Sequence, residues 1–385
     1  MQIPFNSSPR SSLGVEWELQ LVDRHTRQLT SGATEILAEL SPDGEHPAAK
    51  QELLQSTIEI VTGVCQTVPE AMDDLSATIE QVAVLAEQRG LGLMCAGTHP
   101  STDWQSQQIS SNPRYDKLIE DGQWLARRLQ IFGVHVHVGV RSPDKAIAMV
   151  NALTAYIPHF LALSASSPYW VGADTGLASA RSKVFEALPT AGLPQQLKDW
   201  AQFEDYMETL IKTGTIDSIK EVWWDVRPHP TYGTVELRIC DGLPSLAEVG
   251  MVAALSQCLV EGMDRQIDSG YTLPTPRRWV VQENKWRAAR YGLDAQIIVG
   301  QDGLTPVRDA LRELVQDMRP AAERLGCHEH LDTVEEVVET GASYQRQRAV
   351  AAASGGDLSA VVDSLLAEFD AGRPSRLTPA PVPAR

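Results

Sequence analysis

A short stretch with strictly alternating side chains constrains the fold more than any other part of this sequence. It reads F-G-V-H-V-H-V-G-V from Phe132 to Val140. Such alternation predicts a β-strand, because successive side chains of a strand point to opposite faces of the sheet. The valines can then pack into a core while His135 and His137 share the other face. The glycines on either side of this pair allow something to approach the backbone closely there.

Two further stretches place carboxylates by the same alternation. Near the start, residues 13–21 carry leucine, valine and tryptophan on one parity, which leaves Glu16 and Glu18 on the other. In the second half of the chain, Glu236 and Arg238 alternate with valine, leucine and isoleucine. If these strands belong to one sheet, they place the following side chains on a single surface: Glu16, Glu18, His135, His137, Glu236 and Arg238.

Residues 50–64 are a further source of carboxylates. Alternation over the second half of this segment predicts a strand, which adds Glu59 to the polar surface. Glu52 has the opposite parity, so it can reach that surface only through a bulge or a change of structure.

Carboxylates gathered on one surface repel each other, and a bound cation is the natural compensation. Magnesium fits this composition best, because it prefers oxygen ligands and commonly bridges carboxylates to the phosphates of a nucleotide. Arg238, Arg227 and Arg181 would supply positive charge for a phosphate or a substrate carboxylate.

Each of these patterns also has a structural interpretation. An H-x-H pair on a strand is often a packing feature, and E-x-E or E-x-R pairs often form solvated faces or ion pairs between strands. Recurrence of the arrangement on three strands favours a functional surface over coincidence. The adjacent tryptophans Trp223 and Trp224, taken alone, favour packing.

Composition and absent motifs exclude several classes of function. The net charge of −17 argues against general nucleic-acid binding. Five cysteines without a C-x-x-C pair suit a reducing compartment, and the long apolar run at 147–163 is interrupted by polar residues and a proline. We therefore expect a cytoplasmic protein that does not span a membrane. No P-loop, Rossmann or zincin motif is present.

The order of elements predicts an α+β fold, in which a mostly antiparallel sheet carries helices on one face. One catalytic domain is expected over residues 13–370, after an N-terminal extension at 1–12 and before a disordered, proline-rich tail at 371–385. Helical periodicity predicts helices at 33–40, 69–89, 142–163, 195–213, 217–221, 245–267, 278–290, 307–325, 331–339 and 358–369.

Several long motifs resemble the glutamate-cysteine ligase type 2 family of carboxylate-amine ligases. They follow the family's order from about residue 14 to residue 350 and include G-V-E-W-E-L-Q-L-V-D, Q-S-T-I-E-I-V-T-G-V-C, G-T-H-P, G-V-H-V-H-V-G-V and W-D-V-R-P-H-P-T-Y-G-T-V-E-L-R-I-C-D.

The resemblance implies a glutamine-synthetase-like fold whose curved sheet forms a funnel for ATP, a divalent metal (Mg²⁺ or Mn²⁺) and an amino acid. It implies a homo-oligomer and a ligase that joins the γ-carboxylate of glutamate to an amine, cysteine by default, through an acyl phosphate. Carried over by motif, the metal residues are Glu16, Glu18, Glu52, His137 and Glu236, the catalytic residues are Arg238, Arg227 and Glu59, and the substrate-binding residues are His135, Arg181, Thr98 and Trp224.

Two other functions remain open at this stage. A metal-dependent hydrolase could use His135 and His137, but it would need further ligating histidines on later strands, and the remaining histidines fall in predicted loops or helices. A sensor with the ligase fold could bind nucleotide or amino acid without turnover.

Overall fold

A seven-stranded sheet forms the centre of the computed structural model, which describes residues 1–300 and 303–376. The strands lie in the order β2-β3-β1-β5-β9-β8, and β4 pairs with the far end of β1. Every pairing in this sheet is antiparallel, as predicted. The strands are β1 (Leu13–Asp23), β2 (Ala49–Gln51), β3 (Thr57–Val61), β4 (Leu91–Met94), β5 (Val134–Gly139), β8 (Val226–His229) and β9 (Thr234–Leu237).

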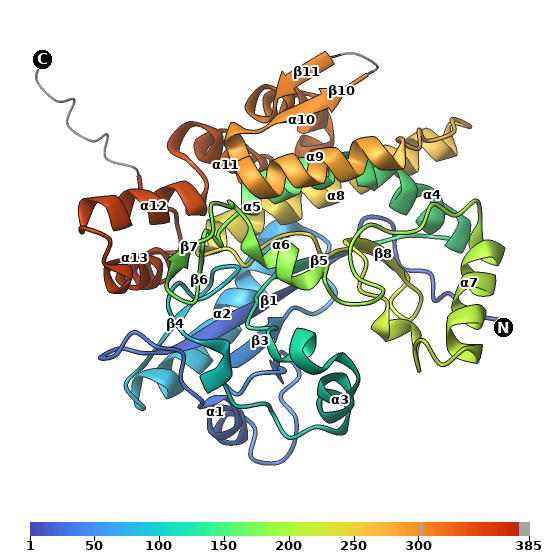
Figure 1. Ribbon diagram of the computed structural model, residues 1–385. Helices are drawn as coiled ribbons and strands as arrows, with labels where there is room; N and C mark the ends of the chain where they lie inside the picture. The colour runs from blue at the N-terminus through green and yellow to red at the C-terminus, as the bar shows by residue number, and fades with distance from the viewer. Residues whose placement is uncertain (301–302, 377–385) are drawn as a thin grey trace, which may run out of the picture.

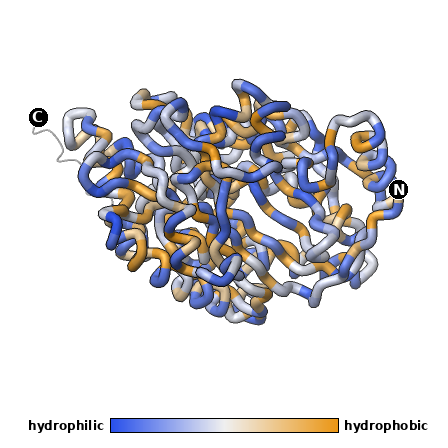
Figure 2. Tube along the Cα trace, turned by 90° about the horizontal axis from the view of Figure 1, so that it is seen from below, coloured by the Kyte–Doolittle hydropathy of each residue, from blue (hydrophilic) through white to orange (hydrophobic). Residues whose placement is uncertain are grey.

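The two faces of the sheet differ as the alternation predicts. Along β1, Leu13, Val15 and Trp17 are buried in the core, whereas Glu16 and Glu18 are only partly buried. The indole N–H of Trp17 donates to the carbonyl of residue 243 at 3.1 Å, which satisfies its one polar group inside the core. Hydrophobic segments alternate with hydrophilic ones along the trace rather than collecting in one part of the chain (Figure 2).

Helices cover the apolar face of the sheet. α2 (Val68–Glu87) packs against β1 and β3, and α8 (Leu246–Asp268) packs against β1 and β5 (Figure 1). The other helices are α1 (Ala33–Leu40), α3 (Pro113–Arg127), α4 (Pro143–Leu153), α5 (Ile157–Ser164), α6 (Ala180–Phe185), α7 (Trp200–Lys212), α9 (Arg278–Tyr291), α10 (Val307–Leu325), α11 (His328–Thr340), α12 (Ser343–Ala353) and α13 (Leu358–Ala371).

Two helical segments are long and apolar enough to cross a membrane by composition. They are Pro143–Ser164 and Leu246–Asp268, and 78% and 83% of their most apolar stretches are buried inside the fold. This burial is typical of core helices. The first segment is interrupted by a 3-10 turn, and Pro158 lies in the first turn of α5, where its missing N–H costs little.

The sequence prediction missed α12 because that helix has no apolar stripe. Its buried side chains include Arg346, which ion-pairs with Glu248 and Glu368 at 2.8 Å each. Because mostly charged and polar side chains are buried on this helix, its sequence lacks the apolar residues at helical spacing from which a helix is predicted. The small hairpins β6 (Tyr169–Trp170) with β7 (Ala173–Asp174), and β10 (Gln296–Val299) with β11 (Gly303–Pro306), were also not predicted.

The N-terminus and the end of the described part of the chain, at residue 376, lie on opposite sides of the molecule (Figure 1). The predicted N-terminal extension packs against α7 and α8: the carbonyl of Ile3 accepts from the indole of Trp200 at 3.2 Å, and Arg10 pairs with Glu261 at 2.7 Å. Of the predicted tail, residues 377–385 lie outside the described part of the chain. The backbone N–H of Ser375 donates to a buried glutamate at 3.1 Å.

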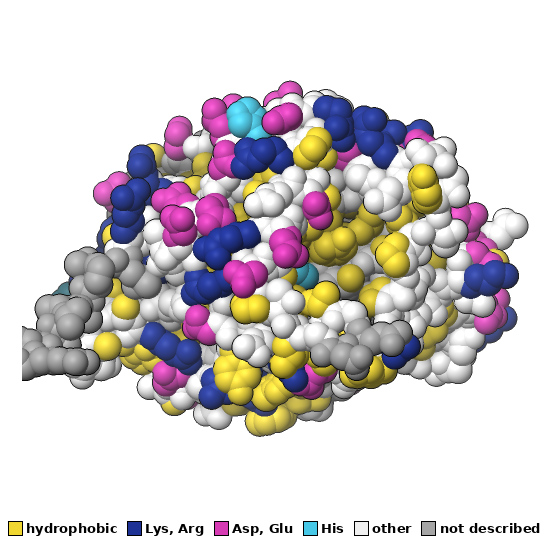
Figure 3. Space-filling model, turned by 90° about the horizontal axis from the view of Figure 1, so that it is seen from above, with side chains coloured by type: hydrophobic (Ala, Val, Ile, Leu, Met, Phe, Trp, Pro, Cys, Tyr) yellow, Lys and Arg dark blue, Asp and Glu magenta, His cyan; other side chains and the backbone are white. Residues whose placement is uncertain are grey.

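Charges of both signs are interspersed on the face formed by the last helices (Figure 3). Ion pairs join α10 to α11 there, one of them between Arg312 and Glu335 at 2.9 Å and another between Arg319 and Asp332. The basic side chains of this face therefore form no single large patch of the kind that non-specific nucleic-acid binding uses.

Candidate active site

A cavity of about 290 Å³ lies on the polar face of the sheet. Strands β1, β3, β5 and β8 contribute to its walls, together with α6 and the segment that follows β2. The predicted site residues that line it are Glu16, Glu18, Glu52, Glu59, His135, Arg181, Arg227 and Arg238. His137 and Glu236 lie beneath this surface, 6% and 1% exposed.

The strand register sets which of these side chains meet. Glu18 on β1 lies opposite Glu59 on β3, and Glu16 lies opposite His135 on β5. Further along the sheet, His137 lies opposite Glu236 on β9. Residues directly opposite on one face lie close enough for their side chains to interact. The register therefore divides the polar surface into two charge clusters.

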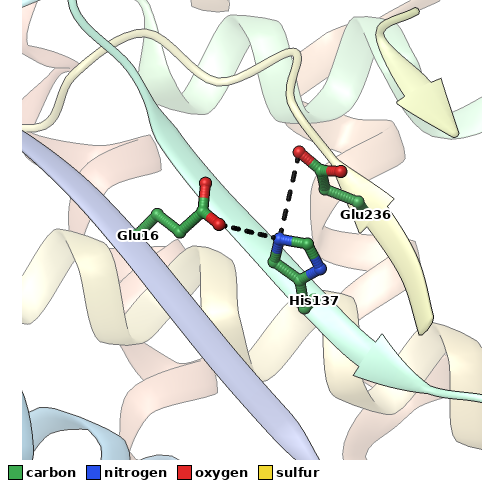
Figure 4. Close-up of side chains that lie close together, drawn as sticks. All are labelled: Glu16, His137 and Glu236. Atoms are coloured by element: carbon green, nitrogen blue, oxygen red, sulfur yellow. Dashed lines mark hydrogen bonds and ion pairs between the residues drawn. The ribbon is translucent and has the colours of Figure 1, made fainter. Parts of the chain in front are cut away.

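The first cluster, which we call the paired cluster, is centred on Glu236. Arg227 donates to both oxygens of this carboxylate at 2.7 and 3.2 Å, and Arg238 donates to one of them. Nε2 of His137 lies 3.9 Å from the same carboxylate (Figure 4). Burial alone would raise the pKa of Glu236, but the two arginines and the histidine hold it well below its ordinary value.

Glu16 connects the paired cluster to β1. Its two carboxylate oxygens meet Nδ1 of His135 at 3.0 Å and Nε2 of His137 at 3.2 Å. Against the effect of burial, these histidines hold the pKa of Glu16 below its ordinary value. Burial and the neighbouring Arg238 lower the pKa of His135 to about 4, so this imidazole is neutral near pH 7.

The second cluster, the acidic triad, consists of Glu18, Glu52 and Glu59. Oxygens of the three carboxylates lie within 4.8 Å of one another. Glu18 accepts from the backbone N–H of Gly133 at 2.6 Å and Glu52 from that of Leu53 at 3.0 Å, but no Lys, Arg or His of residues 1–300 or 303–376 forms an ion pair with the triad.

The pKa values of the triad move in the opposite direction from those of the paired cluster. Burial, with repulsion from Glu52, raises the pKa of Glu18 to about 7. Burial and the neighbouring carboxylates raise the pKa of Glu59 well above its ordinary value. Three crowded carboxylates without an ion-pair partner suit a hard divalent cation, which takes oxygen ligands. The residues therefore fit the Mg²⁺ or Mn²⁺ that the resemblance implies.

Glu52 reaches the triad through the change of structure that its parity required. Strand β2 ends at Gln51, immediately before Glu52, and the chain turns before β3 begins at Thr57. The turn frees Glu52 from the alternation of the strand.

The glycines beside the histidine pair are approached by the protein's own groups. A Cβ on Gly133 would lie 2.3 Å from Nη2 of Arg181, and a Cβ on Gly139 would lie 2.2 Å from Oγ of Ser12. A side chain at Gly139 would meet backbone, and one at Gly133 would displace the guanidinium group of Arg181. Gly133 thus lets Arg181 reach the cavity, whereas Gly139 accommodates the N-terminal segment.

Thr98 and Trp224, which the resemblance suggested as substrate-binding residues, lie outside the cavity lining. Thr98 is buried and its hydroxyl donates to the carbonyl of Tyr169 at 2.7 Å. Trp224 is 2% exposed and packs against Tyr206 with ring centroids 5.6 Å apart. The adjacent Trp223 lines the cavity instead. Alternation along the chain explains why Trp223 rather than Trp224 lines the cavity. Trp223 is an even number of residues from Arg227, which also lines it, whereas Trp224 is not.

Sequence reasoning missed several residues of the cavity wall, including Arg114, Tyr115, Trp223, His229 and Tyr232. The first two lie at the start of α3, at the end of the polar segment 97–115, whose length is typical of a functional loop. The expectation that every remaining histidine falls in a loop or a helix was wrong, because His229 ends β8. Its ring stacks on Tyr232 with centroids 4.3 Å apart.

Two solved structures share the fold over almost the whole chain. A bifunctional glutathione synthetase from Pasteurella multocida superposes with a TM-score of 0.68 at 15% identity, over 94% of this chain and 52% of that one. A glutamate-cysteine ligase from Francisella tularensis in complex with AMP superposes with a TM-score of 0.68 at 11% identity, over 95% and 90%. The predicted glutamine-synthetase-like fold is thereby confirmed.

Sequence relatives identify the family. A protein of Frankia casuarinae named "Putative glutamate--cysteine ligase 2-1" is 63% identical over 97% of this chain and 99% of its own length. A relative of Thermobifida fusca with the corresponding name is 59% identical over 97% and 95%. The pattern of the glutamate-cysteine ligase family 2 (GCS2) matches residues 12–364. The chain belongs to this family.

Proposed function

We propose that the protein joins the γ-carboxylate of glutamate to an amine at the expense of ATP, with cysteine as the default acceptor. The observation that carries the proposal is the acidic triad, which faces arginine side chains across one cavity. Carboxylates without an ion-pair partner suit a metal-nucleotide complex, and arginines suit a phosphate or a carboxylate.

The arginines support the binding of anionic substrates. Nε of Arg181 and Nε of Arg238 are buried and have no hydrogen-bond partner within residues 1–300 and 303–376. Both side chains also line the cavity, where a guanidinium group suits an anionic substrate. Arg227 uses most of its donors on Glu236 and on the carbonyl of Val222 at 2.8 Å, which supports a positioning role for Arg227.

Glu18, Glu52 and Glu59 would hold the divalent cation, with Glu16 and His137 beside them. A bound Mg²⁺ or Mn²⁺ supplies charge neutralisation for the phosphates of ATP. The geometry favours a ligand role for Glu59, because its carboxylate shares the triad. Glu236 is already neutralised by two arginines, and this favours a positioning role over direct ligation.

The proposed reaction has two steps. The glutamate γ-carboxylate takes the terminal phosphoryl group of ATP, which releases ADP. The amine nitrogen then bonds to the acyl carbon while the carbon–oxygen bond to phosphate breaks, so that inorganic phosphate leaves and the amine proton passes to solvent. Arg238 and Arg181 line the cavity and would stabilise the transferring group. Cys240 is no candidate nucleophile, since it is buried and burial raises the pKa of its thiol to about 12.

The test is phosphate release from ATP in the presence of Mg²⁺, glutamate and a panel of single amines. Release that needs glutamate and is stimulated by one amine, with the amide identified by mass spectrometry, is expected. Release that is independent of glutamate would contradict the proposed donor. No release in any mixture, despite measurable ATP binding, would favour the sensor function instead.

The hydrolase alternative loses its basis with the family assignment and the ligase fold.

We also propose a cytoplasmic location, which the five free and buried cysteines support. The homo-oligomeric state stays a prediction from the resemblance.

A further inference from the structure

A second, smaller cavity of about 140 Å³ adjoins the catalytic cavity. Arg114, Leu118, Leu188 and Trp223 line both spaces, so the two cavities are neighbours. The second cavity lies between α3, the segment that follows α6, and the turn before β8. We call it the side pocket.

The walls of the side pocket differ in chemistry from those of the catalytic cavity. Leu118, Leu188, Pro189, Ile216 and Trp223 form an apolar wall, and the charged residues of the pocket, apart from the half-buried Glu221, belong to exposed positions. The phosphates of ATP and the carboxylate of glutamate gain nothing from such a wall, so the groups that suit it are the adenine ring and an apolar side chain of the acceptor. An apolar recess beside the reacting centre is a form in which enzymes bind an apolar substituent.

The size of the side pocket limits that substituent. An engineered protein cavity of about 150 Å³ binds benzene. The side pocket is close to that volume, so it accommodates a phenyl ring or a branched alkyl group. The short side chain of cysteine, one methylene group and a thiol, would leave most of the apolar wall uncovered.

Arg114 lies where the two cavities meet. Its side chain forms no hydrogen bond and no ion pair with residues 1–300 or 303–376, although it lines both spaces. A guanidinium at this junction suits the carboxylate of an amino acid whose side chain points into the side pocket. That orientation leaves the amino group toward the catalytic cavity.

We infer that the side pocket binds the side chain of the acceptor, and that the acceptor is an α-amino acid with an apolar side chain of leucine to phenylalanine size. This inference rests on the proposed function and replaces its default acceptor.

The experiment compares acceptors in the full-length protein with Mg²⁺, ATP and glutamate. Phosphate release and amide formation are measured with phenylalanine, leucine, alanine and cysteine. Because an apolar pocket discriminates by roughly 10-fold or more for each missing group, kcat/KM for phenylalanine or leucine should exceed that for cysteine by at least about 10-fold.

A matched pair of variants tests the pocket itself. Thr215 is an exposed residue of the pocket wall, and its hydroxyl contacts that of Thr213 at 2.9 Å, outside the wall. Thr215→Phe fills the pocket, whereas Thr213→Phe loses the same hydroxyl contact and leaves the pocket open. Thr215→Phe should raise the KM for the bulky acceptor at least about 10-fold, with the KM values for ATP and glutamate unchanged. Thr213→Phe should change none of them.

The carboxylate contact is tested by Arg114→Gln with phenylalanine and phenethylamine. The variant should raise the KM for phenylalanine and leave that for phenethylamine unchanged. An equal rise in KM for both acceptors would show that Arg114 contacts ATP or glutamate instead, and would contradict its contact with the carboxylate of the acceptor.

The remaining outcomes separate the pocket from the proposed function. A preference for cysteine or alanine that Thr215→Phe does not alter would overturn the acceptor assignment and leave the ligase intact. A raised KM for ATP with every acceptor would place the adenine ring in the side pocket and also overturn it. No glutamate-dependent release with any acceptor would overturn the proposed function, and the acceptor assignment with it.

Discussion

The paired cluster and the acidic triad lie on the same face of one sheet, yet the fold treats their carboxylates in opposite ways. Glu236 is surrounded by Arg227, Arg238 and His137, and its pKa is held low. Glu59 shares its surroundings with two other carboxylates, and its pKa is raised. A buried carboxylate with its counter-charge inside the fold supports the structure, whereas one without it is available to an external cation.

The largest expected effect is on stability, in the paired cluster. Glu236→Gln removes the buried charge that neutralises two half-buried arginines and should lower the free energy of unfolding by about 3–5 kcal/mol. Urea unfolding measures it. As a control, Glu39→Gln breaks an exposed ion pair with Arg89 and should cost at most about 1 kcal/mol. Equal losses in the two variants would show that Glu236 is not held by its arginines.

The same substitution in the acidic triad should leave stability intact and reduce activity. Glu59→Gln relieves repulsion among three carboxylates, so the free energy of unfolding should stay the same or rise. Its phosphate release with ATP, glutamate and the acceptor should fall at least about 100-fold, as expected when a group that stabilises transferring charge is lost. A Glu59→Gln protein that turns over normally would remove Glu59 from the site.

Adding a metal should sharpen the comparison further. Mg²⁺ at about 100 times its dissociation constant should raise the free energy of unfolding by about 2.7 kcal/mol, and EDTA should reverse the gain. Glu59→Gln should lose most of this response while Glu39→Gln keeps it. Thermal unfolding with and without Mg²⁺ gives the measurement, and a full response in Glu59→Gln would place the metal outside the triad.

The smallest expected effect is on the pH dependence of the metal-free protein. Glu18 has a pKa of about 7 in the folded state and an ordinary value of 4.5, so between these values the folded state binds the extra proton. The free energy of unfolding should therefore fall as pH rises through this window, by at most about 1.4 kcal/mol per pH unit.

Glu16 should contribute in the opposite direction, because its pKa is lowered. Its stabilisation should be present above pH 4.5 and be lost as the pH falls further. Unfolding curves of Glu18→Gln between pH 5 and 7, roughly the window defined above, should show a shallower pH dependence than the unsubstituted protein. An identical dependence would contradict the raised pKa of Glu18.

Much of the fold was predictable where the pattern is local. The helices at 33–40 and 307–325 have the predicted bounds, and the polar parity of β1, β5 and β9 faces the site. The helix α12 was not predictable, because a buried ion network around Arg346 replaces its apolar stripe. The two-residue period of a strand, counted back from Arg227, points to Trp223 rather than Trp224 as the cavity residue. Using that period requires knowing that the extended segment reaches back to these tryptophans, which the sequence alone does not show.

The sequence by itself determined which side chains share a face, because the two-residue period of a strand is a property of the local backbone. The tertiary structure decided which of them meet. Only the strand register places Glu18 opposite Glu59 and His137 opposite Glu236. Pairing between distant segments has no local signature, and so the division into a neutralised cluster and a free acidic triad, as well as the side pocket beneath α3, follows from long-range packing alone.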